Sequence, residues 1–235
     1  MGLPKEEGFY TPIPATWLQM VDVGKYWLAK GVDGFRVDFA HSVPIEFWQY
    51  FAKELRLDFP ETFLVAEAYE SDLTMKLPGF SYKNFLAAGF DSVYESSTYW
   101  KMRSVAERPW TMNQTGLPGS SLTFDAEMQQ KEAMLTRYME NHDEIRVASK
   151  FFNPNLDQTQ RSQLGWAMTA YLSLLPGHLL IHGGQEFGED ATLTGDFAGD
   201  NGRTSIFDFV YQEKVKNWFQ GLQDVRMLRH LDFWI

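Results

Sequence analysis

Residues 31–41 read Gly-Val-Asp-Gly-Phe-Arg-Val-Asp-Phe-Ala-His, and this stretch decides the fold. Within it, Gly34 to Asp38 is a short apolar run that ends in a carboxylate. A pattern typical of an amphipathic helix comes before it, from Thr16 to Lys30. A helix followed by a short buried-type strand is the building unit of a parallel sheet covered by helices. The stretch therefore predicts an α/β protein.

The same alternation of strand and helix continues along the chain. Further strands are predicted at residues 62–67, 90–94, 136–140 and 179–181, and further helices at 45–57, 84–88, 125–135, 157–175 and 212–231. Stretches rich in Gly, Pro, Asp and Asn predict long loops at 106–124 and 184–210. The pattern predicts about five parallel strands with surrounding helices, in one domain spanning residues 1–235, and no linker divides the chain.

Composition and charge exclude several classes of function. The chain has 235 residues, of which 44% are hydrophobic and 22% are charged, as in a globular protein. Acidic residues outnumber basic ones by 31 to 21, so nucleic acids and anionic membranes are not expected as partners. With no cysteine there are no disulfides, thiolate metal sites or cysteine nucleophiles. No signal peptide or membrane-span pattern is present, which slightly favours a cytoplasmic location.

Three predicted strands end in acidic residues. Asp38 and Glu67 end two neighbouring strands, and Asp143 closes the segment Tyr-Met-Glu-Asn-His-Asp at residues 138–143. Because the carboxyl ends of parallel strands open into a shared mouth, the three carboxylates are expected around one cavity. Their mutual repulsion should keep one of them protonated near neutral pH. A protonated acid beside an ionised one is what glycoside hydrolysis requires.

Other polar residues of these segments fit the same site. Arg36 lies two residues before Asp38 on the same strand face, where a guanidinium can hold a carboxylate ionised and oriented. His142 and His41 offer hydrogen bonds to sugar hydroxyls, and Tyr69 follows a strand, where its ring could stack on a sugar.

Each of these residues also has a purely structural interpretation. A single carboxylate is more often a loop acid or a helix cap, and Arg36 fits a structural ion pair. His41 fits a hydrogen-bonded loop histidine equally well, and Tyr69 fits the core equally well. Tryptophans at helical positions are predicted to lie in the core: Trp17, Trp27, Trp48, Trp166 and Trp218.

Four segments together resemble the signature regions of a known enzyme family. They are residues 31–41, 63–70 (Phe-Leu-Val-Ala-Glu-Ala-Tyr-Glu), 139–149 (Met-Glu-Asn-His-Asp-Glu-Ile-Arg-Val-Ala-Ser) and 176–190. They resemble regions of the α-amylase family, the retaining α-glucan enzymes built on a (β/α)8 barrel. Their order is similar to that of strands four, five, seven and eight. The resemblance implies a partial TIM-type barrel that lacks the first three βα units, with no calcium-binding insertion domain and no C-terminal β-domain.

The resemblance also implies a role for each matching residue. Asp38 would be the nucleophile, Glu67 the general acid/base, and Asp143 the third acid, which grips hydroxyls of the distorted sugar. Arg36 and His142 match the invariant arginine and histidine of the family. Substrate-binding candidates comprise Arg36, His142, His41, Asn141 and Tyr69. His41 departs from the pattern, because many amylases place that histidine four residues after the nucleophile and here it comes three residues after.

The implied activity leaves three alternatives open. The first is a retaining hydrolase of α-1,4-glucans or maltooligosaccharides, and the second is an α-glucan transferase, since residues 38–48 are reminiscent of maltosyltransferases. The third is a catalytically impaired fragment that only binds sugar, because the first signature region of the family has no counterpart here. No organic cofactor or metal is implied by the residues present. Calcium is common in the family, but its main ligands would come from the part that has no counterpart.

The predicted half-barrel has a physical consequence for association. Five parallel strands leave two edges with unpaired backbone groups and expose an apolar inner face. We therefore expect self-association through these edges, a rearranged open sheet or aggregation.

Overall fold

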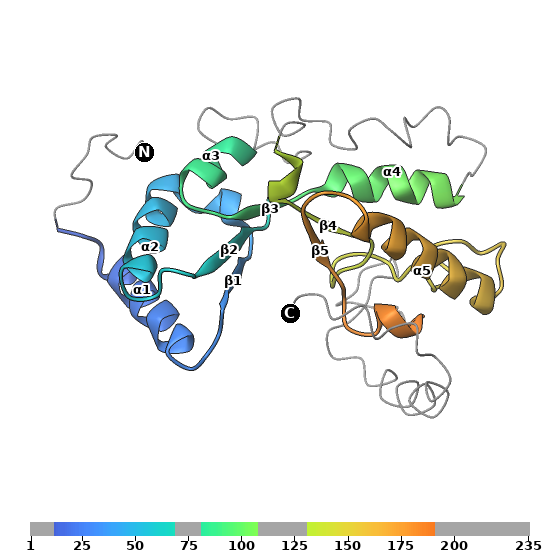
Figure 1. The fold of residues 1–235 in the computed structure, drawn as a ribbon, viewed down its shortest axis with the longest axis horizontal. Helices are drawn as coiled ribbons and strands as arrows, with labels where there is room; N and C mark the ends of the chain where they lie inside the picture. The colour runs from blue at the N-terminus through green and yellow to red at the C-terminus, as the bar shows by residue number, and fades with distance from the viewer. Residues whose placement is uncertain (1–11, 69–80, 108–130, 191–235) are drawn as a thin grey trace. The chain divides into compact units, whose positions relative to one another are not determined.

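The structure is a computed structural model that describes residues 12–68, 81–107 and 131–190. Helices and strands alternate along these residues (Figure 1). In chain order they are α1 (Ala15–Leu28), β1 (Gly34–Val37), α2 (Ile45–Asp58), β2 (Phe63–Ala66), α3 (Tyr82–Ala87), β3 (Ser92–Tyr94), α4 (Ser96–Glu107), β4 (Leu135–Tyr138), α5 (Gln158–Ser173) and β5 (His178–Leu180). Short 3-10 turns are η1 (Ala40–Ser42), η5 (Glu132–Met134) and η6 (Gln185–Phe187).

The five strands are neighbours in the order of the sequence, β1-β2-β3-β4-β5. The pairs β1/β2, β2/β3 and β3/β4 are parallel, and Gly34 lies opposite Phe63 at the start of the first pair. A Cβ atom on Gly34 would lie 1.9 Å from the Phe63 carbonyl oxygen, so only glycine allows this close approach. The prediction of an α/β fold, built as a partial TIM-type barrel of about five strands, is confirmed.

The chain divides into two compact units. Of the described residues, the first comprises 12–68, 81–98, 131–137 and 176–178, and the second comprises 99–107, 138–175 and 179–190. The first unit therefore holds β1, β2 and β3 with helices α1, α2 and α3, while the second holds α5 and most of α4. The single-domain organisation that the sequence suggested, with neither of the two further domains, stays a prediction.

The core of the first unit lies between its helices and strands. Helices α1 and α2 pack closely, because a Cβ on Gly24 would come within 2.9 Å of Leu55 Cδ2. Phe51 and Leu55 of α2 are buried beside Leu64 of β2. The alternation of buried apolar residues on α2 with exposed polar ones explains why this segment forms an amphipathic helix.

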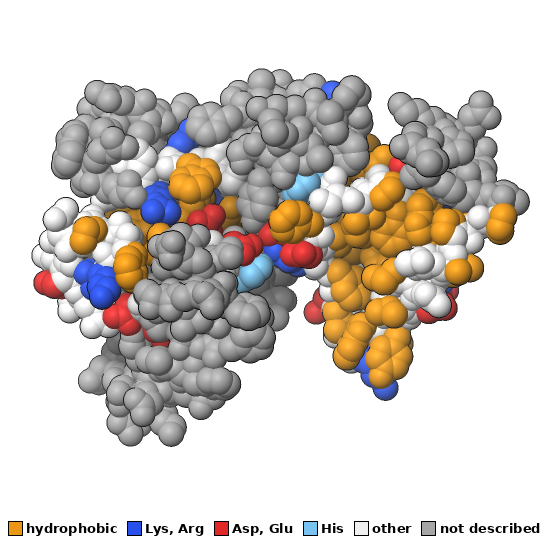
Figure 2. Space-filling view, turned by 180° about the vertical axis from the view of Figure 1, so that it is seen from behind, with side chains coloured by type: hydrophobic (Ala, Val, Ile, Leu, Met, Phe, Trp, Pro, Cys, Tyr) orange, Lys and Arg blue, Asp and Glu red, His pale blue; other side chains and the backbone are white. Residues whose placement is uncertain are grey.

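The tryptophan prediction is only partly correct. Trp48 is buried and Trp17 packs against the core, whereas Trp27 is 50% exposed and Trp166 is 44% exposed. The core prediction is therefore wrong for Trp27 and Trp166, and Trp218 lies outside the described residues. Trp27 is exposed because α1 carries a second apolar face of exposed side chains: Leu18, Met20, Val23, Tyr26 and Trp27. Figure 2 shows broad hydrophobic areas on the side of α1 and α2, at the right of that view.

Element boundaries differ from the predictions in two places. Helix α4 follows β3 directly, where the sequence analysis predicted no element between the strand at 90–94 and the loop at 106–124. The helix expected at 125–135 is wrong where it can be compared, because residues 132–134 form η5 and Leu135 begins β4. The helix expected at 212–231, and most of the loops expected at 106–124 and 184–210, lie outside the described residues.

The start of α5 agrees with prediction. The Asp157 carboxylate accepts a hydrogen bond from Gln160 N at 2.8 Å, and the Gln160 side chain accepts one from Asp157 N at 3.0 Å. This capping box satisfies two backbone N–H groups that the helix itself leaves unpaired. Of the helices in the described ranges, none has the length and apolar character needed to cross a membrane.

Candidate active site

The carboxyl ends of β1 and β2 bring two of the predicted acids together in the first unit. Asp38 directly follows β1 and Glu67 directly follows β2, and Val37 lies opposite Ala66 in the parallel register. Backbone hydrogen bonds continue past the strands, from Glu67 N to Val37 O at 2.9 Å and from Ala40 N to Glu67 O at 3.0 Å. The two acidic residues are therefore fixed at adjacent strand ends.

Arg36 links these two carboxylates. Its Nη1 donates to Asp38 Oδ1 at 2.6 Å, and its Nη2 donates to Glu67 Oε1. The Asp38 side chain is 67% exposed, whereas the Glu67 side chain has no exposed surface. The guanidinium also lies 5.5 Å from the ring centre of Tyr94. Burial by itself lowers the pKa of Arg36, but the neighbouring Glu67 and Tyr94 outweigh it, so the pKa is raised and the guanidinium stays charged.

The second oxygen of Glu67 is held by the backbone. Phe39 N donates to Glu67 Oε2 at 2.9 Å. Phe39 has φ = +43°, and within the described ranges it is the single non-glycine residue in the left-handed region. Such a backbone costs on the order of 1 kcal/mol or more and persists only where its surroundings impose it. The strained turn after Asp38 thus points an N–H group at Glu67.

His41 lies inside the protein rather than in the mouth of the site. It belongs to η1, its side chain is buried, and its ring packs 5.3 Å from the ring of exposed Phe39. A substrate contact by His41 remains a prediction, and its position agrees equally with the structural interpretation.

The second unit holds the other predicted polar residues on one turn after β4. Asp143 N donates to Asn141 Oδ1 at 2.8 Å, and Glu144 N donates to Asn141 O at 3.3 Å. His142 Nε2 lies 3.4 Å from Asp143 Oδ2, and both side chains are partly exposed. Asn141 is buried and shapes the turn through its amide oxygen, so His142 and Asp143 are presented to solvent from a fixed backbone.

Two charged residues that the sequence analysis missed support this turn. Glu140 and Arg146 are both buried, and Arg146 Nη1 donates to Glu140 Oε2 at 2.9 Å. The sequence holds a signal for this pair: a glutamate directly precedes the Asn-His-Asp segment, and an arginine follows it six residues after that glutamate. His182 lies near this pair, and its pKa is lowered to about 4 by burial, by the positive charge of Arg146 and by the neighbouring His142.

The structure thus gathers the predicted residues in two groups. Arg36, Asp38 and Glu67 meet in the first unit, and Asn141, His142 and Asp143 share a turn in the second. The convergence of all three carboxylates around one pocket stays a prediction. Tyr69 lies outside the described residues.

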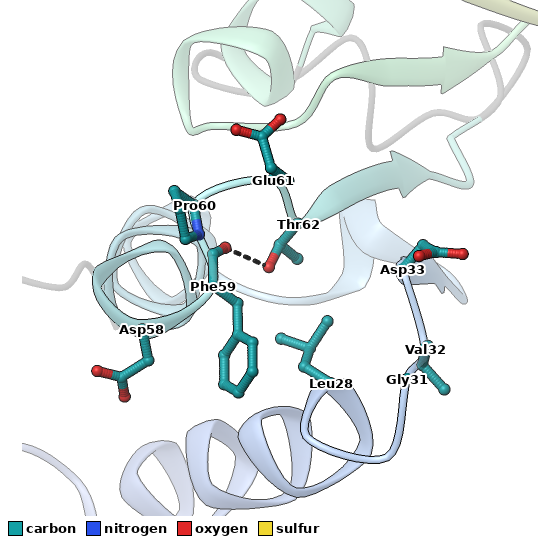
Figure 3. Close-up of a pocket in the computed structure, with 9 residues that line it drawn as sticks. All are labelled: Leu28, Gly31, Val32, Asp33, Asp58, Phe59, Pro60, Glu61 and Thr62. Atoms are coloured by element: carbon teal, nitrogen blue, oxygen red, sulfur yellow. Dashed lines mark hydrogen bonds between the residues drawn. The ribbon is translucent and has the colours of Figure 1, made fainter.

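A pocket of about 330 Å³ opens at the opposite ends of β1 and β2 (Figure 3). It is lined by Leu28, Gly31, Val32, Asp33, Asp58, Phe59, Pro60, Glu61 and Thr62. Asp33 precedes β1 and Glu61 precedes β2, so both acids lie at the amino ends of the strands. Asp58 is paired with Lys25 at 2.6 Å. In the described ranges no group of three or more His, Cys, Asp or Glu could hold a metal ion.

The fold and the site together define a class of protein. Parallel strands that alternate with helices, with carboxylates at their carboxyl ends, are the architecture of (β/α)-barrel enzymes. The family description "Alpha amylase, catalytic domain" matches residues 7–218 of this chain. The chain therefore belongs to the α-amylase family and carries part of the catalytic domain of a glycoside hydrolase-like enzyme.

Individual relatives fall into two groups. An α-1,4-glucan:maltose-1-phosphate maltosyltransferase of Salinibacter ruber is 35% identical over 94 residues, which are 40% of this chain and 13% of the relative. Alpha-amylase 3 of Dictyoglomus thermophilum is 27% identical over 185 residues, which are 74% of this chain and 33% of the relative. The chain therefore spans a third or less of the length of these relatives.

Solved structures show the same fold. The α-amylase of Geobacillus thermoleovorans complexed with acarbose gives a TM-score of 0.58 at 21% identity, covering 88% of this chain and 44% of that chain. The cyclic α-maltosyl-(1→6)-maltose hydrolase of Arthrobacter globiformis in complex with maltose gives a TM-score of 0.54 at 18% identity. That match covers 89% of this chain and 45% of the other.

Proposed function

We propose that this chain acts in the hydrolysis of α-1,4-glucans or maltooligosaccharides with retention of configuration. Asp38 is the nucleophile, Glu67 the general acid/base, and Asp143 binds hydroxyls of the reacting sugar. The observation that carries the proposal is the placement of Asp38 and Glu67 on the two Nη atoms of Arg36. Carboxylates that share one guanidinium are compatible with the separation of about 5–5.5 Å used by retaining enzymes.

The reaction runs in two displacements. In the first, an Asp38 carboxylate oxygen forms a bond to the anomeric carbon, the glycosidic carbon–oxygen bond breaks, and the leaving oxygen takes the proton of Glu67. In the second, an acceptor water gives a proton to the Glu67 carboxylate, its oxygen bonds to the anomeric carbon, and Asp38 is released. The hydrogen bonds from Arg36 Nη2 to Oε1 and from Phe39 N to Oε2 hold the Glu67 side chain in place, and each oxygen keeps a second lone pair that can take the proton.

Release of reducing sugar from starch tests the proposal. We expect turnover by the wild-type chain and a loss of at least ~1,000-fold in Asp38→Asn and Glu67→Gln, because each removes a reacting group. Asp33→Asn and Glu61→Gln are matched controls, since they neutralise the same residue types at the other ends of the same two strands. Turnover that survives in both site variants, or that is lost equally in the controls, would overturn the assigned roles.

Transfer of a glucan unit is a second candidate function. Its support is the similarity to several maltosyltransferases, from 31% to 37% identical over 55 to 96 residues. In that case a sugar hydroxyl replaces water as the acceptor of the second displacement. Incubation with maltose 1-phosphate and a glucan primer distinguishes the two, because transfer releases phosphate and lengthens the primer.

Sugar binding without turnover is a third candidate. The supporting observation is that the Glu67 side chain has no exposed surface, so a leaving group reaches it only if neighbouring residues move. Isothermal titration with maltooligosaccharides tests this candidate. Heat of binding without release of reducing sugar favours it over the other two.

We also propose that the chain associates with a second copy of itself. Within the described residues β1 has a neighbouring strand on one side only, and the adjoining helix α1 exposes Met20, Val23 and Trp27. Gel filtration should give a mass of at least twice 27.2 kDa for the wild type, and a lower mass for Val23→Glu. A wild-type monomer would contradict this proposal.

A further inference from the structure

We propose that Arg146 is a positioning residue, which fixes the turn that presents His142 and Asp143. The inference rests on the proposed function, in which Asp143 binds the reacting sugar. Arg146 is buried, and its two Nη atoms donate to Glu140 at the base of the turn and to Gly183 beyond β5, so it acts on the turn by holding the chain that carries it.

The turn is closed at its base by a buried carboxylate. Glu140 accepts two hydrogen bonds from the returning chain, from Arg146 Nη1 to Oε2 at 2.9 Å and from Val147 N to Oε1 at 2.8 Å. Both oxygens of Glu140 are therefore used to hold residues 146 and 147 beside residue 140. Charge-assisted hydrogen bonds of this kind are the strong ones in a protein interior.

Arg146 also ties this base to another segment. Its Nη2 donates to the Gly183 carbonyl oxygen at 2.8 Å, just after β5. In addition, Val147 packs against α5, where a Cβ on Gly165 would lie 3.3 Å from Val147 Cγ1. The base of the turn is thus fixed to two neighbouring elements, while only residues 142–144 reach partial exposure.

The arrangement depends on both the charge and the planar shape of the arginine side chain. Burial raises the pKa of Glu140, and Arg146 and the Val147 N–H group oppose that rise. Lysine at position 146 would keep a positive charge, but its single ammonium group does not reproduce the planar fork that serves Glu140 and Gly183 at once. Arg146→Lys is therefore the variant that tests geometry rather than charge.

A double-mutant cycle on turnover separates positioning from a general structural effect. We expect Arg146→Lys to lower kcat ~10- to 100-fold, because displacement of a substrate-binding group by about 1 Å has effects of that size. In an Asp143→Asn background the same change should lower kcat clearly less than in the wild type, because one of the two positioned groups is already lost and only His142 remains to be displaced. Equal effects of Arg146→Lys in both backgrounds would overturn the inference.

Arg161→Lys is the matched control. Arg161 is a second buried arginine of the same unit, and its side chain donates to backbone oxygens, to Ala148 O at 2.7 Å and to Leu156 O. We expect this variant to lower stability while leaving kcat within ~2-fold of the wild type in both backgrounds. The control thus shows what loss of a buried arginine does without loss of the turn.

Amide hydrogen exchange gives a readout that needs no activity. The N–H groups of Asp143 and Val147 are bonded to Asn141 Oδ1 and Glu140 Oε1. In Arg146→Lys both should exchange at least ~10-fold faster, with Leu64 N of the first unit unchanged. Unchanged exchange at both amides would overturn the inference. A wild-type chain without turnover would overturn the proposed function instead, and the exchange result would then decide the inference by itself.

Discussion

Replacement of Arg36 by glutamine is the most direct test of the linked carboxylates. The change removes the guanidinium between Asp38 and Glu67 and leaves both acids in place. Most of the expected cost comes from Glu67, because its side chain is fully buried and removal of one partner of a buried ion pair costs about 3–5 kcal/mol. The contact with the exposed Asp38 adds only about 0–1 kcal/mol.

The assay is equilibrium urea unfolding at pH 7, followed by circular dichroism. Since whole domains have free energies of unfolding of about 5–15 kcal/mol, a loss of about 3 kcal/mol moves the midpoint clearly. In the double variant Arg36→Gln/Glu67→Gln the buried carboxyl group that has lost its partner is absent, so part of the stability should return. Lys25→Gln is the control for a more exposed pair, Lys25–Asp58 at 2.6 Å, and should cost about 0–1 kcal/mol.

Two results would refute this reasoning. The first is a loss in Arg36→Gln no larger than the loss in Lys25→Gln, which would mean that Glu67 does not depend on the guanidinium. The second is a double variant no more stable than Arg36→Gln alone, because the cost would then not come from an unpaired buried carboxylate.

Four further variants test other parts of the structure by the same unfolding assay. Gly34→Ala should cost about 2 kcal/mol or more, because its Cβ would meet Phe63 O at 1.9 Å. At Gly183, the part of the chain that the structure describes places no atom beyond the adjacent residues within 4 Å of an added Cβ, so Gly183→Ala should change stability by less than about 0.5 kcal/mol. Asp157→Ala should cost about 1 kcal/mol through loss of the capping box, and a change within about 0.3 kcal/mol would contradict that role. For His182, the folded pKa of about 4 lies below the ordinary 6.5, so the unfolded state takes up the proton first as pH falls. Its contribution to stability is therefore complete above pH 6.5 and is lost between pH 6.5 and 4, and His182→Gln should show a smaller loss over that range than the wild type.

The order of strands and helices could be predicted because each signal is local. Short apolar runs that end in acids mark β1 and β2, and Asp157 followed by Gln160 marks the start of α5. The contact of Arg36 with Asp38 could be predicted in the same way, because residues two apart on a strand share a face. In each case the residues that decide the outcome lie within a few positions of one another.

The exposure of α1 could not be predicted from its own pattern. The helix carries apolar residues on two faces, and periodicity does not show which face packs against α2. Val21, Gly24 and Leu28 are buried, whereas Val23 and Trp27 face outward. The distinction depends on Phe51 and Leu55 of α2, which contact the glycine position of α1 and are distant in sequence.

The contacts of Arg36 with Glu67 and of Arg146 with Gly183 could not be predicted, for the same reason. Arg36 reaches Glu67 on the next strand, and Arg146 reaches Gly183 beyond β5, so both arginines act across elements that are far apart in the chain. The type of a catalytic residue is a property of its motif, but its orientation depends on partners that packing brings to it. For this chain the motifs name Asp38, Glu67 and Asp143 as candidates, while the contact of Arg36 with Glu67 and the proposed role of Arg146 depend on residues that packing brings together.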